Sequence, residues 1–217
     1  MVTINKSLAA GIRKSNARDM IQEIRDRGNA LLKASKAHQF SYEVGLRRMD
    51  MLCAIRRRRP NAGARAGNDL LFVDYDSSDS MLLFKYEEVD KRGRPIKKDS
   101  DRVLMAVSQH ATESLYQRLR TFEWADVIGE LRPVGAWLLE NLHTVVMEKE
   151  GYLVTPTGVF PVVRGYKDAV YQVDDVPNWL ATTWISQANL EDHTPHKRRV
   201  AEAVRAVSGK GVQFVKI

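Results

Sequence analysis

The chain has 217 residues, of which 44% are hydrophobic and 28% are charged, and its formal net charge is +7. This length predicts one domain, or one domain with an appendage, of ordinary globular composition. No run of eighteen apolar residues occurs, the first residues lack the apolar centre of a secretory signal, and Cys53 is the only cysteine. We therefore expect a cytoplasmic protein without a membrane span or an internal disulfide.

The positive charge is concentrated in the N-terminal part of the chain. Residues 1–65 hold fifteen Lys and Arg against five Asp and Glu, a balance of +10, whereas residues 66–217 hold nineteen against twenty-two, a balance of −3. Such an asymmetry favours a surface that binds nucleic acid or another acidic partner. The alternative is a solvated helical face without a ligand.

Two helices are predicted first, over residues 3–28 and 29–58, and the second ends in the four arginines Arg56, Arg57, Arg58 and Arg59. Pro60 and the glycines after it stop regular structure and indicate a linker. Four adjacent arginines repel one another unless an anion lies nearby, and a phosphate backbone or an acidic protein would supply that anion. We predict a basic helical region over 1–66.

The remainder, 67–217, is predicted to be an α+β domain in which helices pack on an antiparallel β-sheet. The sequence pattern predicts these elements in chain order: strands at 69–76 and 80–90, a charged loop at 91–101, a helix at 101–122, a helix at 123–143 broken near Pro133 and Gly135, two strands within 151–165 joined by a tight turn, strands at 169–173 and 179–187, a helix beginning at Thr194 and Pro195 and ending near Gly209, and a strand at 212–217.

Several common catalytic motifs are absent from the sequence. No Gly-rich nucleotide loop, nucleophile elbow or HExxH zinc motif occurs. His193 and His196 lie three residues apart where a helix begins, a place that favours capping or solvent exposure over metal binding. We therefore expect no metal and no cofactor.

The segment "VSQHATESLYQRL", residues 107–119, combines a core stripe with a polar stripe at helical spacing. His110 lies on the polar stripe, and a histidine exchanges a proton near neutral pH. Arg118 follows eight residues later, on the same side of the helix and about 12 Å along its axis. These two side chains could line one groove.

A second set of chemically able side chains lies in the predicted strands. Arg164 follows the tight turn, and Thr182, Thr183 and Trp184 stand together in a later strand. Hydroxyl groups and cations can hold a phosphate, while an aromatic ring can stack on a base. Each residue also has a structural alternative, in which the histidine caps a helix, the arginine pairs with an acid and the tryptophan lies in the core.

The motifs "SQHA", "TPTGVFPVVRG" and "LATTWIS" together resemble metal-independent ribonuclease toxins of the barnase–EndoU–colicin–RelE class, over about residues 105–187. The resemblance implies that His110 is the catalytic general acid or base. It implies that Arg118 and Arg164 bind the phosphate, that Thr182 or Thr183 hydrogen-bonds near it, and that the protein is a toxin or a bacterial defence effector. The chain departs from the family in having Ser114 where an arginine is usual.

Three functions remain open on the sequence. The first is metal-independent cleavage of RNA by His110 with Arg118, Arg164 and a threonine. The second is binding of nucleic acid without catalysis, through Arg56–Arg59 and the basic helices. The third is an adaptor of a phage or mobile element whose basic helices bind an acidic protein. If the protein is instead a toxin, we expect an inhibitory antitoxin to bind the same helices.

Overall fold

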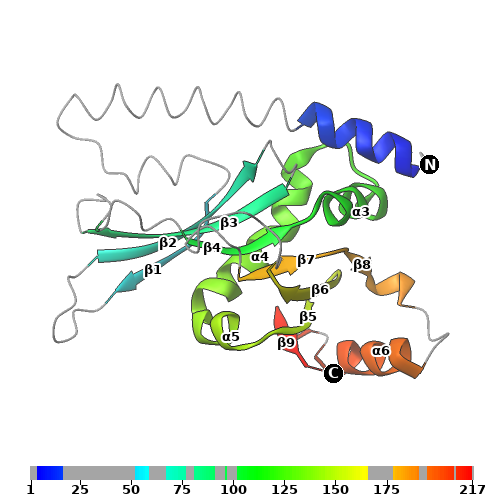
Figure 1. The fold of residues 1–217 in the computed structure, drawn as a ribbon. Helices are drawn as coiled ribbons and strands as arrows, with labels where there is room; N and C mark the ends of the chain where they lie inside the picture. Colours follow the sequence, from blue (N-terminus) through cyan, green and yellow to red (C-terminus); the bar gives the residue numbers. More distant parts are fainter. Residues whose placement is uncertain are drawn as a thin grey trace.

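The computed structural model describes residues 4–16, 52–58, 67–76, 81–90, 96, 102–165, 178–190, 195–207 and 209–216. Within these residues, one mixed β-sheet forms the centre of the fold (Figure 1). Its strands are β1 (Leu52–Arg58), β2 (Gly67–Asp76), β3 (Met81–Asp90), β4 (Arg102–Val107), β5 (Glu150–Val154), β6 (Gly158–Arg164), β7 (Trp179–Ala181), β8 (Ile185–Ser186) and β9 (Gln213–Val215).

The strand order is β1-β2-β3-β4-β7-β6-β5-β9, and β8 pairs with β6. Most neighbouring strands are antiparallel, but β4 and β7 run parallel, with Val107 opposite Ala181. The C-terminal ends of the neighbouring strands β4 and β7 therefore lie next to each other, and the segments that follow these two strands begin side by side.

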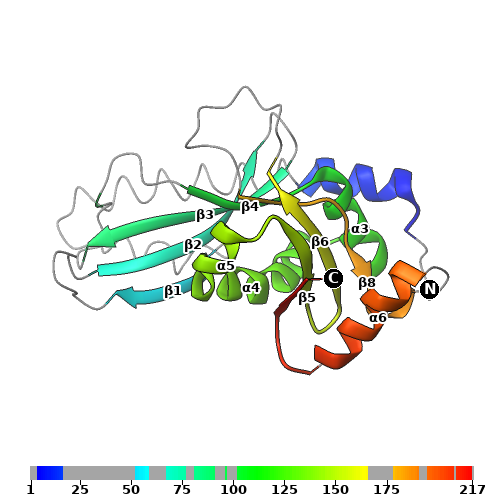
Figure 2. The ribbon, with the colours of Figure 1, turned by 60° about the horizontal axis from the view of Figure 1, so that its bottom comes forward.

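The helices are α3 (Gln109–Leu119), α4 (Trp124–Glu140), α5 (Leu142–Met147), the short η1 (Gln187–Asn189) and α6 (Pro195–Val207). Residues 6–16, called here the N-terminal helix, are also helical. Figure 2 shows α4 across one face of the sheet, where it packs against β1 and β2. The N-terminal helix lies beside α3 in both views.

Apolar periodicity explains how these elements pack. Residues of β3 alternate between buried and half-buried, apart from two adjacent buried residues, while β4 is buried at every position after Arg102. The main core joins the sheet to α3 and α4, and its largest fully buried side chains include Trp179, Trp184 and Phe84. A smaller cluster, around Val200 and Val204, packs α6 onto the sheet. The predicted α+β class is confirmed.

Three details of the predicted elements are wrong. Leu52–Arg58 form strand β1 rather than the end of a helix, so the sheet begins before residue 67, where we placed the start of the α+β domain. Residues 102–107 form β4, and the helix predicted from 101 begins only at Gln109. Helix α4 continues through Pro133 instead of breaking there.

The predicted strands at 69–76, 80–90 and on both sides of the "PTG" turn are confirmed, as is the helix that has Pro195 at its first position. The predicted strand at 179–187 is divided into β7 and β8, and it ends in η1. Outside the described residues lie the predicted strand at 169–173, Thr194, Arg59, all of residues 17–51, and residues 91–101 except 96.

Candidate functional site

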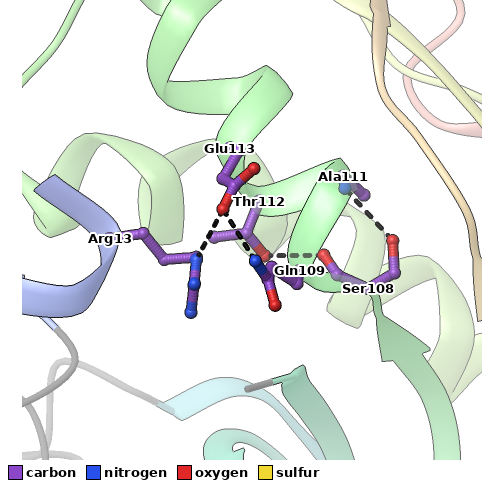
Figure 3. A network of polar contacts seen from close by, with 6 residues as sticks. All are labelled: Arg13, Ser108, Gln109, Ala111, Thr112 and Glu113. Atoms are coloured by element: carbon purple, nitrogen blue, oxygen red, sulfur yellow. Dashed lines mark hydrogen bonds and ion pairs between the residues drawn. The ribbon is translucent and has the colours of Figure 1, made fainter. Parts of the chain in front are cut away.

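The first turn of α3 begins where β4 and β7 end, and Ser108 joins the two segments. The Ser108 N–H donates to the carbonyl of Ala181 at 3.0 Å, and its hydroxyl donates to the carbonyl of Thr182 at 2.9 Å. The same hydroxyl accepts from the Ala111 N–H at 3.1 Å, which caps the helix (Figure 3). One serine therefore holds the start of α3 against the segment that follows β7.

His110 is the second residue of α3, and its side chain is exposed. Thr182 is exposed and Thr183 is half-buried. The bond from Ser108 to Thr182 brings the beginning of α3 next to both threonines. The structure therefore places His110 and the predicted threonines on neighbouring segments at the same edge of the sheet.

Arg118 lies in the last turn of α3, away from His110. Its Nη1 donates a hydrogen bond to the main-chain carbonyl of Trp184. Burial lowers the pKa of Arg118 below its ordinary value, because the charged form loses hydration. Arg118 therefore fixes the position of the segment between β7 and β8, and this contact occupies one of its donors.

Trp184, which we predicted to stack on a base, is a core residue. Its side chain is 1% exposed, and its ring packs against Phe160 with the ring centroids 6.4 Å apart. The indole also lies over Gly158, where it fills the space that a side chain would need. A ring enclosed in this way offers no face to a base from solution, which corrects that prediction.

Arg164 is exposed at the end of β6, and the strand register separates it from Thr182. Its Cα lies opposite Trp179, the first residue of β7, whereas Thr182 follows the last. Three residues of extended chain correspond to about 10 Å. The structure therefore does not bring Arg164 together with the start of α3.

The arginines Arg56, Arg57 and Arg58 form the end of β1, one of the two terminal strands of the described sheet. Their Cα partners in β2 are Asp69, Asn68 and Gly67, respectively. Because β2, β3 and β4 lie between β1 and β7, these arginines are about 19 Å from β7 across the sheet. They form a second region, separate from His110.

A buried polar network that we did not predict from the sequence joins the N-terminal helix to α3. The Nε of Arg13 lies 3.1 Å from Oε1 of Glu113, and the two side chains are only 3% and 7% exposed. The same carboxylate oxygen accepts from Gln109 at 3.0 Å (Figure 3). Asn16 donates to the Tyr116 hydroxyl at 3.0 Å and to the Phe122 carbonyl at 2.8 Å.

A signal for this docking was present in the N-terminal helix. Ala9 and Ile12 are buried beside Arg13, at spacings that place all three on one side of the helix. An arginine on an apolar stripe needs a buried carboxylate, because an unpaired charge would otherwise lose its hydration. The identity of that carboxylate, one hundred residues away, could not be read from the pattern.

Other classes of site have little support among the described residues. In that part of the chain, no three His, Cys, Asp or Glu side chains are grouped so that they could hold a metal ion. No helix there is both long enough and apolar enough to cross a membrane. No family model, no curated protein and no solved structure matches this chain.

Proposed function

We propose that the protein binds nucleic acid, with RNA as its first ligand, along a surface that includes strand β1. The observation that carries this proposal is the run Arg56–Arg58 at the end of β1, which is a terminal strand of the described sheet. Within the described sheet, β1 has a neighbouring strand on one edge only. A phosphate backbone supplies regularly spaced negative charges that relieve the repulsion among adjacent arginines.

The distribution of charge supports the same kind of ligand. Residues 1–65 carry a balance of +10 and the rest of the chain carries −3. The N-terminal helix is attached to α3 by the buried pair of Arg13 and Glu113, so the basic region is docked on the α+β part at its beginning. A cytoplasmic location fits this proposal, because Cys53 is the only cysteine and cannot form an internal disulfide.

Changing Arg56, Arg57 and Arg58 together to Ser tests this proposal. We expect the affinity for a single-stranded RNA to fall by at least about tenfold at low salt, because three phosphate contacts are lost. Fluorescence anisotropy with labelled RNA measures the change. The control replaces Arg132, Lys149 and Lys216 with Ser, which removes the same charge elsewhere. An equal loss in both variants would remove β1 from the binding surface.

A second candidate function is cleavage of RNA without a metal. The exposure of His110, in the first turn of the helix whose N-cap Ser108 bonds the Thr182 carbonyl, favours it. In this reaction a general base takes the proton of the ribose 2′-hydroxyl, the oxygen attacks the adjacent phosphorus, and an acid protonates the leaving 5′-oxygen. His110 would perform one of these proton transfers, and the Thr182 hydroxyl would hydrogen-bond the phosphate. The resemblance to ribonuclease toxins supports this second candidate. If it is correct, an inhibitory protein is the expected partner of the basic helices.

Purified wild type and His110→Ala, assayed on total RNA in EDTA, test the second candidate. A general acid or base contributes about a hundred- to ten-thousandfold in rate, so His110→Ala should lose that factor. His143→Ala is the matched control, because His143 is an exposed histidine on α5. Absence of cleavage by the wild type, or equal cleavage by all three proteins, would leave binding as the function.

A further inference from the structure

A cavity of about 220 Å³ lies between η1 and α6, outside both regions described above. Its described lining residues are Gln187, Leu190, Ala201, Val204 and Arg205. The last three are spaced by three and four residues, so one side of α6 forms one wall. A cavity of about 150 Å³ can hold benzene, so this one has room for a single flat ring with small substituents.

The lining combines an apolar interior with two polar groups. Ala201 and Val204 are buried and Leu190 is half-buried, so they form the apolar walls. The Gln187 side-chain amide donates to the Thr155 carbonyl at 3.3 Å, which fixes it against the β5–β6 turn. This bond uses one N–H and leaves the amide oxygen able to accept a hydrogen bond from a ligand.

Arg205 adds a cation beside these walls, and its side chain is exposed. The surrounding helix is basic: α6 contains Lys197, Arg198 and Arg199 against one acid, Glu202. Arg198 precedes Arg205 by two turns on the same side of the helix. A ligand that fits this site has a flat body with an apolar face, hydrogen-bonding edges and a negative charge beside it.

We propose that this cavity is a base pocket that takes one unpaired nucleotide of RNA. The base lies between Leu190 and α6, its edge hydrogen-bonds Gln187, and its phosphate contacts Arg205. Amide side chains recognise base edges, and arginine binds phosphate through charged hydrogen bonds. The base pocket rests on the proposed function, RNA binding. It adds a contact to one base, whereas the β1 surface contacts the RNA phosphates.

Titration of the full-length protein with the four ribonucleoside 5′-monophosphates, followed by NMR or calorimetry, tests the pocket. We expect at least one nucleotide to bind more tightly than ribose 5-phosphate, which lacks a base. Leu190→Ala and Arg205→Gln should each weaken that binding by about tenfold, through loss of apolar contact and of a charged hydrogen bond. Arg132→Gln, a change at an exposed arginine of α4, should leave it unchanged.

Equal binding of ribose 5-phosphate, competition by a small aliphatic carboxylate at the same concentration, or insensitivity to Leu190→Ala would overturn the base pocket. The Arg56–Arg58 variant separates this result from the proposed function. If nucleotides fail to bind while RNA binding still depends on β1, the pocket alone is wrong. If nucleotides bind and the β1 variant keeps full RNA affinity, the pocket stands and the β1 surface is wrong.

Discussion

A side chain at Gly158 would have no room, because a Cβ there would lie 2.5 Å from Cε2 of Trp184 and 2.6 Å from the Ile185 carbonyl oxygen. We expect Gly158→Ala to lower the free energy of unfolding by about 1–3 kcal/mol, as overpacking typically does. Gly129 in α4 has nothing within 4 Å of the corresponding position. Gly129→Ala should raise that free energy by about 0.5–1 kcal/mol. Urea unfolding measures both changes. A Gly158→Ala protein as stable as the wild type would contradict the packing of Trp184 over this glycine.

Individual site residues were predictable only where the signal is local. The polar stripe of 107–119 indicated an exposed His110, and the structure places it on the surface. The roles of Arg118 and Trp184 depend on a contact across 66 residues, in which the arginine donates to the tryptophan carbonyl. Periodicity places a residue on a face of its own element, but it does not say which distant element covers that face.

A buried ion pair joins the N-terminal helix to α3, so removing one of its charges should weaken the packing of the helix on α3. Glu113→Ala would leave Arg13 buried without its carboxylate, and we expect a loss of about 3–5 kcal/mol in the free energy of unfolding. The double variant Arg13→Met with Glu113→Leu removes both charges and should recover most of that loss. Chemical denaturation of the three proteins checks this. A single variant as stable as the wild type would show that the helix is not docked in solution.

Each element that was predicted wrongly has an identifiable physical cause. A strand buried at nearly every position, such as β4, has a continuous apolar run that a buried helix also shows. The segment Leu52–Arg58 combines a short apolar part with arginines, and the pattern did not separate strand from helix. Pro133 removes one backbone donor, but both it and Gly129 are exposed, so water can hydrate the freed carbonyl while the apolar stripe of α4 continues.

The whole molecule joins a basic N-terminal region to an acidic remainder, and its sheet extends across the boundary that we predicted at residue 66. The α+β class followed from the sequence because the hydrophobic period changes between elements. The parallel pairing of β4 with β7 did not, since these strands are more than seventy residues apart and register is set by tertiary packing. That pairing is what brings Ser108 to Thr182.

Nucleic-acid binding is tested most directly by the salt dependence of RNA affinity for the full-length protein. Each phosphate contact contributes about −0.7 to the slope of log affinity against log salt concentration for a single strand. If Arg56–Arg58 and their basic neighbours contact phosphates, the slope should be about −2 or steeper, and it should become shallower by about 2 when the three arginines are changed to Ser. An affinity that does not change with salt, or the same slope in both proteins, would contradict binding through this surface.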